Sequence, residues 1–351
     1  MIIKNDDLFE AYKFYFKHNI FEMNREHILD SLLEEVKTAD RDIENIYNIL
    51  IKLSIIAKID FITFMKEIKN KDDASIKNNK HSKEIIDYSL KVIIKLLNEM
   101  DDEEINSFYY DTFCYNENIC HTARVFIMSV QFMKYYNNSI DNNIVLDIKR
   151  EFKDKYAGYY EDVVKKFKMN KKITKLEHVY KDGLRDILFN EIINISIAAF
   201  WHDISNVLIN DNGEEYHILQ SYSYLKHFIR YNDDISLTVG LHNEYYGYGK
   251  GVFLNYYNAA VSDSDTFDSL NYIMSFDSSD TLRFKSISYF PSKVLEIIDL
   301  FDKISYSNDT LSNDEVLSFI GENYLYNEVH IDPIIFDIFS SFIYDNIKLT
   351  A

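Results

Sequence analysis

Proline and glycine are scarce in this sequence, with 2 and 8 occurrences in 351 residues. These residues punctuate the turns of β-sandwiches and barrels, so their scarcity argues against an all-β fold. Hydrophobic residues make up 47% of the chain and aromatic residues 15%, which is enough to build a sizeable core. The composition therefore predicts an all-α fold, and the length favours two domains.

Basic side chains and cysteines are also few. The chain has 38 Lys and Arg against 57 Asp and Glu, a net charge of −19, which argues against DNA as a partner. The two cysteines, Cys114 and Cys120, lack the partners of a four-thiolate zinc site and do not indicate a disulfide framework. We expect them to be reduced thiols of a cytoplasmic protein.

Long apolar runs are missing as well. No stretch reaches the roughly 18 uninterrupted apolar residues of a membrane helix, and the N-terminal residues MIIKNDDLFEAYKFYF lack the basic start of a signal peptide. We therefore expect a soluble chain without a membrane partner. An acidic protein that binds an anionic ligand needs a local positive charge, and bound cations are one source of it.

Amphipathic helices dominate the pattern, because apolar residues recur at steps of three and four. The clearest helical segments span residues 25–36, 46–68, 82–100, 120–136 and 188–204. The polar segment 69–83 predicts a loop. A second polar break at residues 98–107 places a domain boundary near residue 104, which gives an N-terminal helical domain (1–104) and a second domain (105–351).

Two short segments carry candidate metal ligands. Glu117 and His121 are four residues apart, so on one helix their side chains lie on the same face. His202 and Asp203 follow the apolar run IINISIAAF. Adjacent residues on a helix diverge by about 100°. We expect this pair to serve two metal ions, with Asp203 bridging them and His202 binding one.

Three further candidates follow along the chain. His217 and His242 lie in the segments EEYHILQSYSYLKHF and VGLHNEYYGYGKG, and Asp299 lies in the apolar run KVLEIIDLFDKISY. Any one of these residues alone is more typical of surface or capping chemistry. Their order along the chain (His, His-Asp, His, His, Asp) is what indicates a metal centre.

Six segments in this order resemble the motifs of the HD-GYP family, a branch of the HD superfamily of metal-dependent phosphohydrolases. AAFWHDISN is similar to the family's Ala-Ala-x-x-His-Asp-Ile-Gly-Lys, and LHNEYYGYGKG to its His-His-Glu-x-x-Asp-Gly-x-Gly-Tyr-Pro. The resemblance covers about residues 112–340. The six segments are HTARV, AAFWHDISN, HILQSYSYL, LHNEYYGYGKG, KVLEIIDLFDKI and VHIDPIIFDIF.

The resemblance implies an HD-superfamily helical bundle that hydrolyses a cyclic dinucleotide, such as cyclic di-GMP, through a metal-activated water. Two or three iron or manganese ions would be bound, and Asp203 would bridge two of them and act in catalysis. The N-terminal helices would form a regulatory or dimerisation domain, and the formation of a homodimer stays open. The ligands implied are Glu117, His121, His202, Asp203, His217, His242 and Asp299.

Several positions depart from the family pattern. Leu241 stands where the first histidine of a pair belongs, and Asn206 replaces the lysine of the His-Asp motif. Asn308 and Leu311 stand where the family has the Arg and Lys that hold phosphate. Lys250 is the remaining candidate for that role, because it lies in a glycine-rich loop that we expect close to the substrate. A solvated loop lysine explains Lys250 equally well.

The expected substrate contacts are therefore Asn206, Gly247, Gly249 and Lys250. The lost basic residues leave a second hypothesis open, a catalytically impaired HD-GYP-like domain that binds a nucleotide or a protein partner in signalling. A third is a helical scaffold with fortuitous motifs. Segments 137–183 and 252–290 are longer than the family pattern requires, and we expect them to cover or flank the site.

Overall fold

The chain is all-α, as the composition predicts. The computed structural model describes residues 2–3, 5–16, 25–67, 73–106, 117–166, 172–209, 216–245, 253, 274–284, 288–307, 311–327 and 330–346. Within these ranges the strands are β1 (Ile2–Ile3) and β2 (Leu208–Ile209), which pair antiparallel. The chain divides into two compact units, residues 1–131 with 196–232, and residues 132–195 with 233–351.

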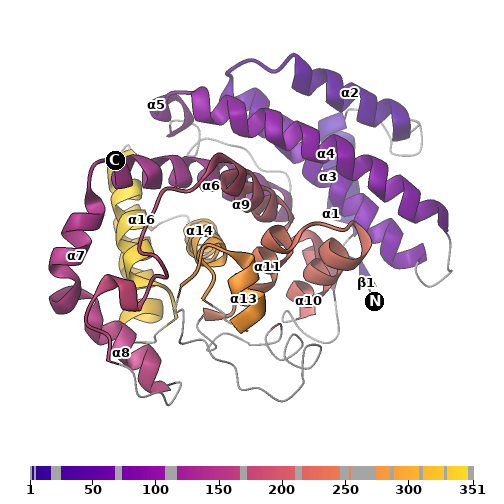
Figure 1. Cartoon of the computed structure of the whole chain (residues 1–351). Coiled ribbons are helices and arrows are strands. Elements are labelled where there is room, and N and C mark those ends of the chain that lie inside the picture. Colours follow the sequence, from indigo (N-terminus) through magenta and orange to yellow (C-terminus); the bar gives the residue numbers. More distant parts are fainter. Residues whose placement is uncertain are drawn as a thin grey trace, which may run out of the picture. The chain divides into compact units, whose positions relative to one another are not determined.

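The first unit is a layer of long helices with short ones packed on it. Figure 1 shows α2, α3 and α4 side by side, and the contacts between these helices agree. The helices α6 and α9 contribute residues to both units. The helical elements of this unit are α1 (Asn5–Phe16), α2 (Arg25–Lys37), α3 (Ile43–Glu67), α4 (Asp73–Glu99), α5 (Asp102–Asn106), the start of α6 (Glu117–Asp141), the end of α9 (Phe189–Trp201), η3 (Ile204–Val207), α10 (Tyr216–Ser223) and η4 (Tyr224–Phe228).

Aromatic side chains join the N-terminal helices to the segment after α9. The ring of Phe61 on α3 lies 5.0 Å from that of Tyr224, and the ring of Phe64 lies 4.5 Å from that of Phe228. Trp201, at the end of α9, packs 6.3 Å from the same Tyr224. Aromatic pairs at these spacings add to the burial of their large apolar surfaces. They hold α3 against the elements that carry His202 and Asp203.

The predicted loop at residues 69–83 is wrong for its larger part, because α4 begins at Asp73. Lys80 and His81 are exposed and Ser82 is buried. Polar composition indicates contact with water and does not by itself indicate irregular backbone. Lysine and glutamate are good helix formers when their side chains remain solvated. Residues 69–72 lie outside the described ranges.

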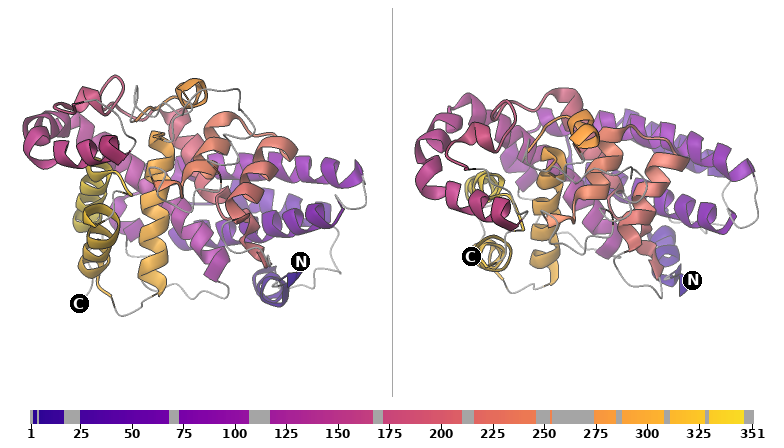
Figure 2. Two further views of the ribbon diagram at one scale, coloured as in Figure 1. Left: turned by 90° about the horizontal axis from the view of Figure 1, so that it is seen from below. Right: turned by 60° about the horizontal axis from the view of Figure 1, so that its bottom comes forward.

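The second unit is also helical, and its α14 and α16 lie side by side in Figure 2, in agreement with their contacts. The rings of Phe132, Phe301 and Phe342 surround that of Phe339 at 5.3, 5.4 and 5.9 Å and form an aromatic core. Besides the remainders of α6 and α9, its helical elements are α7 (Ile144–Lys155), α8 (Ala157–Lys166), η2 (Leu176–His178), α11 (Asp233–Leu241), α13 (Ser278–Phe284), α14 (Phe290–Ser307), α15 (Asn313–Ile320), η6 (Gly321–Tyr326) and α16 (Pro333–Asn346).

Tyrosine hydroxyls anchor the segment 137–183 to the start of α16. Tyr160 and Tyr180 each donate a hydrogen bond of 2.7 Å to the buried carboxylate of Asp332. Tyr156 donates to Asp337 at 2.6 Å. These contacts lie within the second unit, so part of this long segment has a structural role in holding α16.

A capping box starts α15. The hydroxyl of Ser312 accepts a hydrogen bond from the backbone N–H of Glu315 at 3.3 Å, and the Glu315 carboxylate accepts one from the Ser312 N–H at 2.8 Å. We expect Ser312→Ala to lower the free energy of unfolding by about 1 kcal/mol, because one helix N–H loses its acceptor. Urea denaturation measures this, with Ser318→Ala on the same helix as control. Equal midpoints for the two variants would contradict the cap.

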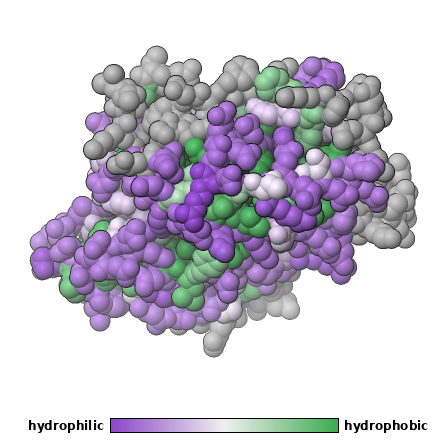
Figure 3. All heavy atoms as spheres, turned by 90° about the horizontal axis from the view of Figure 1, so that it is seen from above, coloured by the Kyte–Doolittle hydropathy of each residue, from purple (hydrophilic) through white to green (hydrophobic). Residues whose placement is uncertain are grey.

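The compact units do not follow the predicted boundary near residue 104, because the first unit continues to residue 131 and includes residues 196–232. Compactness reflects packing rather than independent folding, so the predicted N-terminal domain (1–104) stays a prediction. Among the described residues, no helix combines the length and apolar character needed to cross a membrane. On the face drawn in Figure 3, hydrophilic side chains predominate, as the composition leads one to expect.

Candidate metal centre

A group of buried side chains could hold a metal ion. Among the described residues of the first unit, this group consists of His121, His202 and Asp203. Asp299 is a buried candidate ligand on α14, in the second unit. Three of the predicted ligands are thus candidates for one ion within the first unit.

The ligand atoms of the first unit form a small triangle. Nε2 of His121 lies 3.1 Å from Nε2 of His202, and Oδ2 of Asp203 lies 3.7 and 3.6 Å from these two nitrogens. A point equidistant from the three atoms and in their plane lies about 2.0 Å from each, and bonds from zinc to histidine and carboxylate ligands measure about 2.0–2.2 Å. The triangle therefore has the size that one first-row metal ion requires.

The end of α9 brings His202 and Asp203 together. The helix ends at Trp201, and the two residues form a turn before η3. The expectation that they diverge as neighbours on a helix is wrong, since the helix has ended and Nε2 of His202 and Oδ2 of Asp203 lie 3.6 Å apart. His121 comes from the second turn of α6. One helix and the turn after another thus supply the three candidate ligands.

The orientation of the His202 ring is set by the backbone. Its Nδ1 lies 2.7 Å from the carbonyl oxygen of Ala199, one turn earlier in α9. A carbonyl oxygen only accepts hydrogen bonds, so Nδ1 carries the hydrogen and donates it. In the neutral ring Nε2 then has a lone pair, and Nε2 is the atom in the triangle. This backbone contact is the kind that orients histidine ligands in metal sites.

The second oxygen of Asp203 faces another histidine. Oδ1 of Asp203 lies 3.4 Å from Nε2 of His217, on α10. The hydroxyl of Ser205 donates a hydrogen bond of 2.6 Å to the backbone carbonyl of His217, which links η3 to α10. One carboxylate therefore faces two histidines through one oxygen and a third through the other. This is the arrangement that a bridging carboxylate between two ions needs.

A buried lysine accompanies the cluster, and the sequence interpretation missed it. Lys58 on α3 is 1% exposed, and its Nζ donates a hydrogen bond of 3.1 Å to the backbone carbonyl of Asp203. Burial lowers the pKa of this ammonium to about 8, and the Asp203 charge acts in the opposite direction. A charge within the apolar run SIIAKIDFI was the available signal, because lysine is rarely buried without a function or a partner.

Glu117 does not belong to the buried group. It is the first residue of α6, its side chain is 56% exposed, and its carboxylate forms an ion pair with the buried Arg124. A ligand role would require this ion pair to open. Its role as a ligand stays a prediction.

His242 and Asp299 are described within the second unit. His242 follows α11 and is buried, and its Nδ1 lies 2.7 Å from the Val239 carbonyl, so Nε2 has the lone pair, as in His202. The carboxylate of Asp299 forms an ion pair with Lys303, one turn later in α14, at 2.8 Å. Leu241 is buried and offers no ligand atom. The second unit thus holds one histidine and one aspartate of the predicted set.

A buried ion pair in α14 gives the unfolding free energy a dependence on pH. Glu296 is fully buried, and burial raises its pKa to about 8, against the effect of Lys293 at 2.8 Å. The folded chain thus binds this proton more tightly than the unfolded chain. The contribution to stability is complete below about pH 4.5 and is lost as pH rises through about 8.

We therefore expect the wild type to be less stable at pH 9 than at pH 6, by a few kcal/mol. Glu296→Gln removes the titrating group and retains an acceptor for Lys293, so its stability should change less between the two values. Urea denaturation of both proteins at each pH measures the difference. Parallel pH profiles would contradict this effect of burial.

The expected substrate contacts are described only in part. Asn206 lies in η3, where its side chain is half-buried and its backbone N–H donates to the Asp203 carbonyl at 3.1 Å. Leu311 lies just before α15. The remaining residues of interest, Gly247, Gly249, Lys250 and Asn308, lie outside the described ranges, and their roles stay predictions.

The state of Cys120, which precedes His121, differs from the expected reduced thiol. It is buried in α6 and is disulfide-bonded, so the prediction of reduced thiols is wrong for this residue. Cysteine number and spacing do not report whether the backbone brings two sulfur atoms together. Cys114 lies outside the described ranges.

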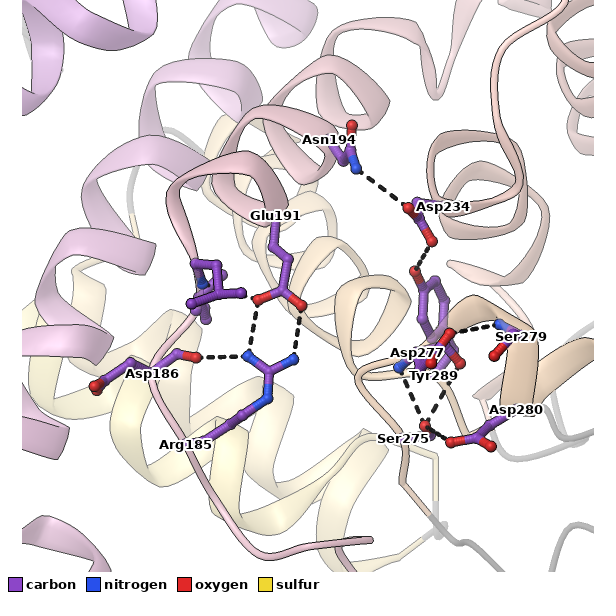
Figure 4. Close-up of polar contacts among 12 residues, drawn as sticks. Arg185, Asp186, Glu191, Asn194, Asp234, Ser275, Asp277, Ser279, Asp280 and Tyr289 are labelled. Carbon is purple, nitrogen blue, oxygen red and sulfur yellow. Dashed lines mark hydrogen bonds and ion pairs between the residues drawn. The ribbon is translucent and has the colours of Figure 1, made fainter.

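A pocket of about 180 Å³ lies within the second unit, apart from these ligands. Figure 4 shows its polar side chains paired with one another. Arg185 binds both carboxylate oxygens of Glu191, at 2.8 and 2.6 Å, and Asp234 accepts hydrogen bonds of 3.3 Å from Asn194 and Tyr289. Within this pocket, the charge of Arg185 is therefore neutralised by Glu191.

Comparisons with protein-family models, curated proteins and solved structures gave no match for this chain. The resemblance to the HD-GYP family therefore rests on the six sequence segments alone. The metal-ligand geometry stands independently of it, because it follows from the distances between side chains.

Proposed function

We propose that the chain is a metal-dependent phosphodiesterase that acts on a cyclic dinucleotide or another small nucleotide. The observation that carries the proposal is the triangle of His121, His202 and Asp203, whose size matches one divalent ion. The second Asp203 oxygen, which faces His217, supports a second ion beside the first. Asp299 and His242 are proposed as further ligands.

The donor set favours iron or manganese. The candidate ligands are imidazole nitrogens and carboxylate oxygens, without thiolate, and such sets suit Fe(II) and Mn(II) as well as zinc. The bound ions would supply Lewis-acid chemistry, because divalent ions acidify water and neutralise phosphate oxygens. The acidic net charge of the chain does not oppose this role, since exposed charges are screened within about 8 Å at physiological salt.

The protein's own residues would prepare this centre in three ways. The Ala199 carbonyl holds the His202 ring in the tautomer that presents Nε2. The Asp203 carboxylate presents both oxygens, one on each side. Burial of His121, His202 and Asp203 excludes bulk water, and electrostatic effects are stronger in such a site.

Turnover assays test the proposal directly. Protein loaded with Mn(II) or, without oxygen, with Fe(II) should convert cyclic di-GMP or a cyclic GMP-AMP to a linear dinucleotide. Asp203→Asn should reduce the rate by at least about a thousandfold, because the carboxylate that joins the ions is lost. Metal-loaded wild type that leaves all of these substrates intact would refute the proposal for them.

Two ion pairs favour a second candidate, an impaired domain that binds a nucleotide or a partner in signalling. Glu117 pairs with Arg124, and Asp299 pairs with Lys303, so two predicted ligands have basic partners. Leu241 leaves a second ion without one of the family's histidines. If Leu241→His raises both metal content and turnover sharply, the impaired domain becomes the better account. No gain would favour the enzyme as it stands.

A further inference from the structure

Lys58 has few partners for a buried ammonium group. It lies on α3 with 1% of its surface exposed, and among the described residues its single hydrogen bond goes to the Asp203 backbone carbonyl. An ammonium carries three donors. A buried charge is costly unless a charge of opposite sign or several hydrogen bonds compensate it. Two donors of Lys58 can therefore serve a further acceptor.

The net charge that Lys58 meets at Asp203 would change from negative to positive when a divalent ion binds. In the protein alone, the negative charge of Asp203 attracts the Lys58 ammonium. His121 and His202 bring no charge as neutral metal ligands. A divalent cation at Asp203 would raise the local charge to about +2 and repel Lys58. An anion bound at the same place would then compensate both the ion and the ammonium.

We propose that Lys58 binds the anionic oxygens of a phosphate group at the His121–His202–Asp203 centre. The proposal rests on the metal centre proposed above and adds its anion-binding residue. Lys58 comes from the N-terminal helices, outside the segments that resemble the HD-GYP motifs. It supplies a positive charge at the turn where Asn206, a neutral residue, stands in place of the family's lysine.

The position of Lys58 within the first unit supports this role. The helix α3 packs against η3, the segment that follows Asp203. The Asp203 carbonyl accepts hydrogen bonds of 3.1 Å from both Lys58 Nζ and the Asn206 N–H. This places the ammonium beside the residue whose carboxylate is proposed to bind the ion. Lysine suits a phosphate here, because its ammonium is a compact charge with three rotatable donors.

Titration of Mn(II) and of inorganic phosphate into wild type and Lys58→Met tests the proposal. With Mn(II) bound, Lys58→Met should bind phosphate at least about tenfold more weakly, because a charge-assisted contact is lost. The same variant should bind Mn(II) about tenfold more tightly, because a repelling charge is removed. A lysine with a merely structural role would not move the two affinities in opposite directions.

Lys52→Met is the matched control, since Lys52 lies on the same helix and pairs with Glu35 at 2.6 Å. It should change neither affinity. Thermal melting establishes that each variant folds, and Lys58→Gln replaces Lys58→Met if the latter does not. Equal phosphate affinity in wild type and the Lys58 variant would overturn the inference. Failure of the wild type to bind Mn(II) would instead contradict the metal centre itself.

Discussion

Replacing Asp203 by asparagine is expected to lower the affinity of the chain for Mn(II) or Fe(II) by at least about a hundredfold. Both Asp203 oxygens face histidine nitrogens, at 3.6 and 3.7 Å through Oδ2 and at 3.4 Å through Oδ1. The amide has nearly the same shape but lacks the negative charge, and its nitrogen is no ligand. Calorimetric titration of wild type and variant measures the loss.

Glu117→Gln provides the contrast for this experiment. The Glu117 carboxylate is paired with Arg124 and is largely exposed, so its replacement should change the affinity of the first ion by less than about threefold. An equal loss in both variants would mean that Glu117 leaves Arg124 to bind the ion. An unchanged affinity in Asp203→Asn would remove Asp203 from the centre.

Asp332→Ala is expected to lower the free energy of unfolding by about 3–5 kcal/mol. The Asp332 carboxylate is buried and accepts hydrogen bonds from the Tyr160 and Tyr180 hydroxyls and from the backbone N–H groups of Ile334 and Ile335. Alanine leaves two buried hydroxyls without this acceptor and also removes the cap of α16. Chemical denaturation measures the change.

Asp337→Ala is the control for Asp332→Ala. Asp337 lies on α16 as well, but it is half-buried, and among the described residues its carboxylate accepts from Tyr156 and Lys155. We expect its loss to cost about 1 kcal/mol. A similar small effect for Asp332→Ala would contradict its role as an anchor. Mn(II) affinity should remain unchanged in both variants.

The helices were predictable because their signal is local. Apolar residues at steps of three and four mark α2, α3, α4, α6 and α9, and all five form. The loop at residues 69–83 failed for the opposite reason, because its polar residues reported solvent contact rather than backbone conformation. The packing of residues 137–183 against α16 depends on Tyr160 and Tyr180, which bind Asp332 although they lie far from it in the sequence. No local sequence pattern predicts such contacts.

Part of the candidate metal centre was predictable from the order of its residues. His121, His202 and Asp203 come together as candidate ligands, and the other oxygen of Asp203 faces His217. The convergence of His202 and Asp203 was not predictable from helical geometry, since it depends on where α9 ends. Lys58 lies 145 residues before Asp203. Its apolar surroundings in the sequence indicate burial, but its place beside Asp203 follows only from the packing of α3 against η3.

Anomalous scattering from crystals of the Mn(II)-loaded chain tests the metal centre most directly. The account predicts a peak about 2.0–2.2 Å from Nε2 of His121, Nε2 of His202 and Oδ2 of Asp203, with a second peak between Asp203 and His217 if two ions bind. Crystals of fully loaded protein with Mn(II) only at exposed carboxylates, and none at these three atoms, would contradict it.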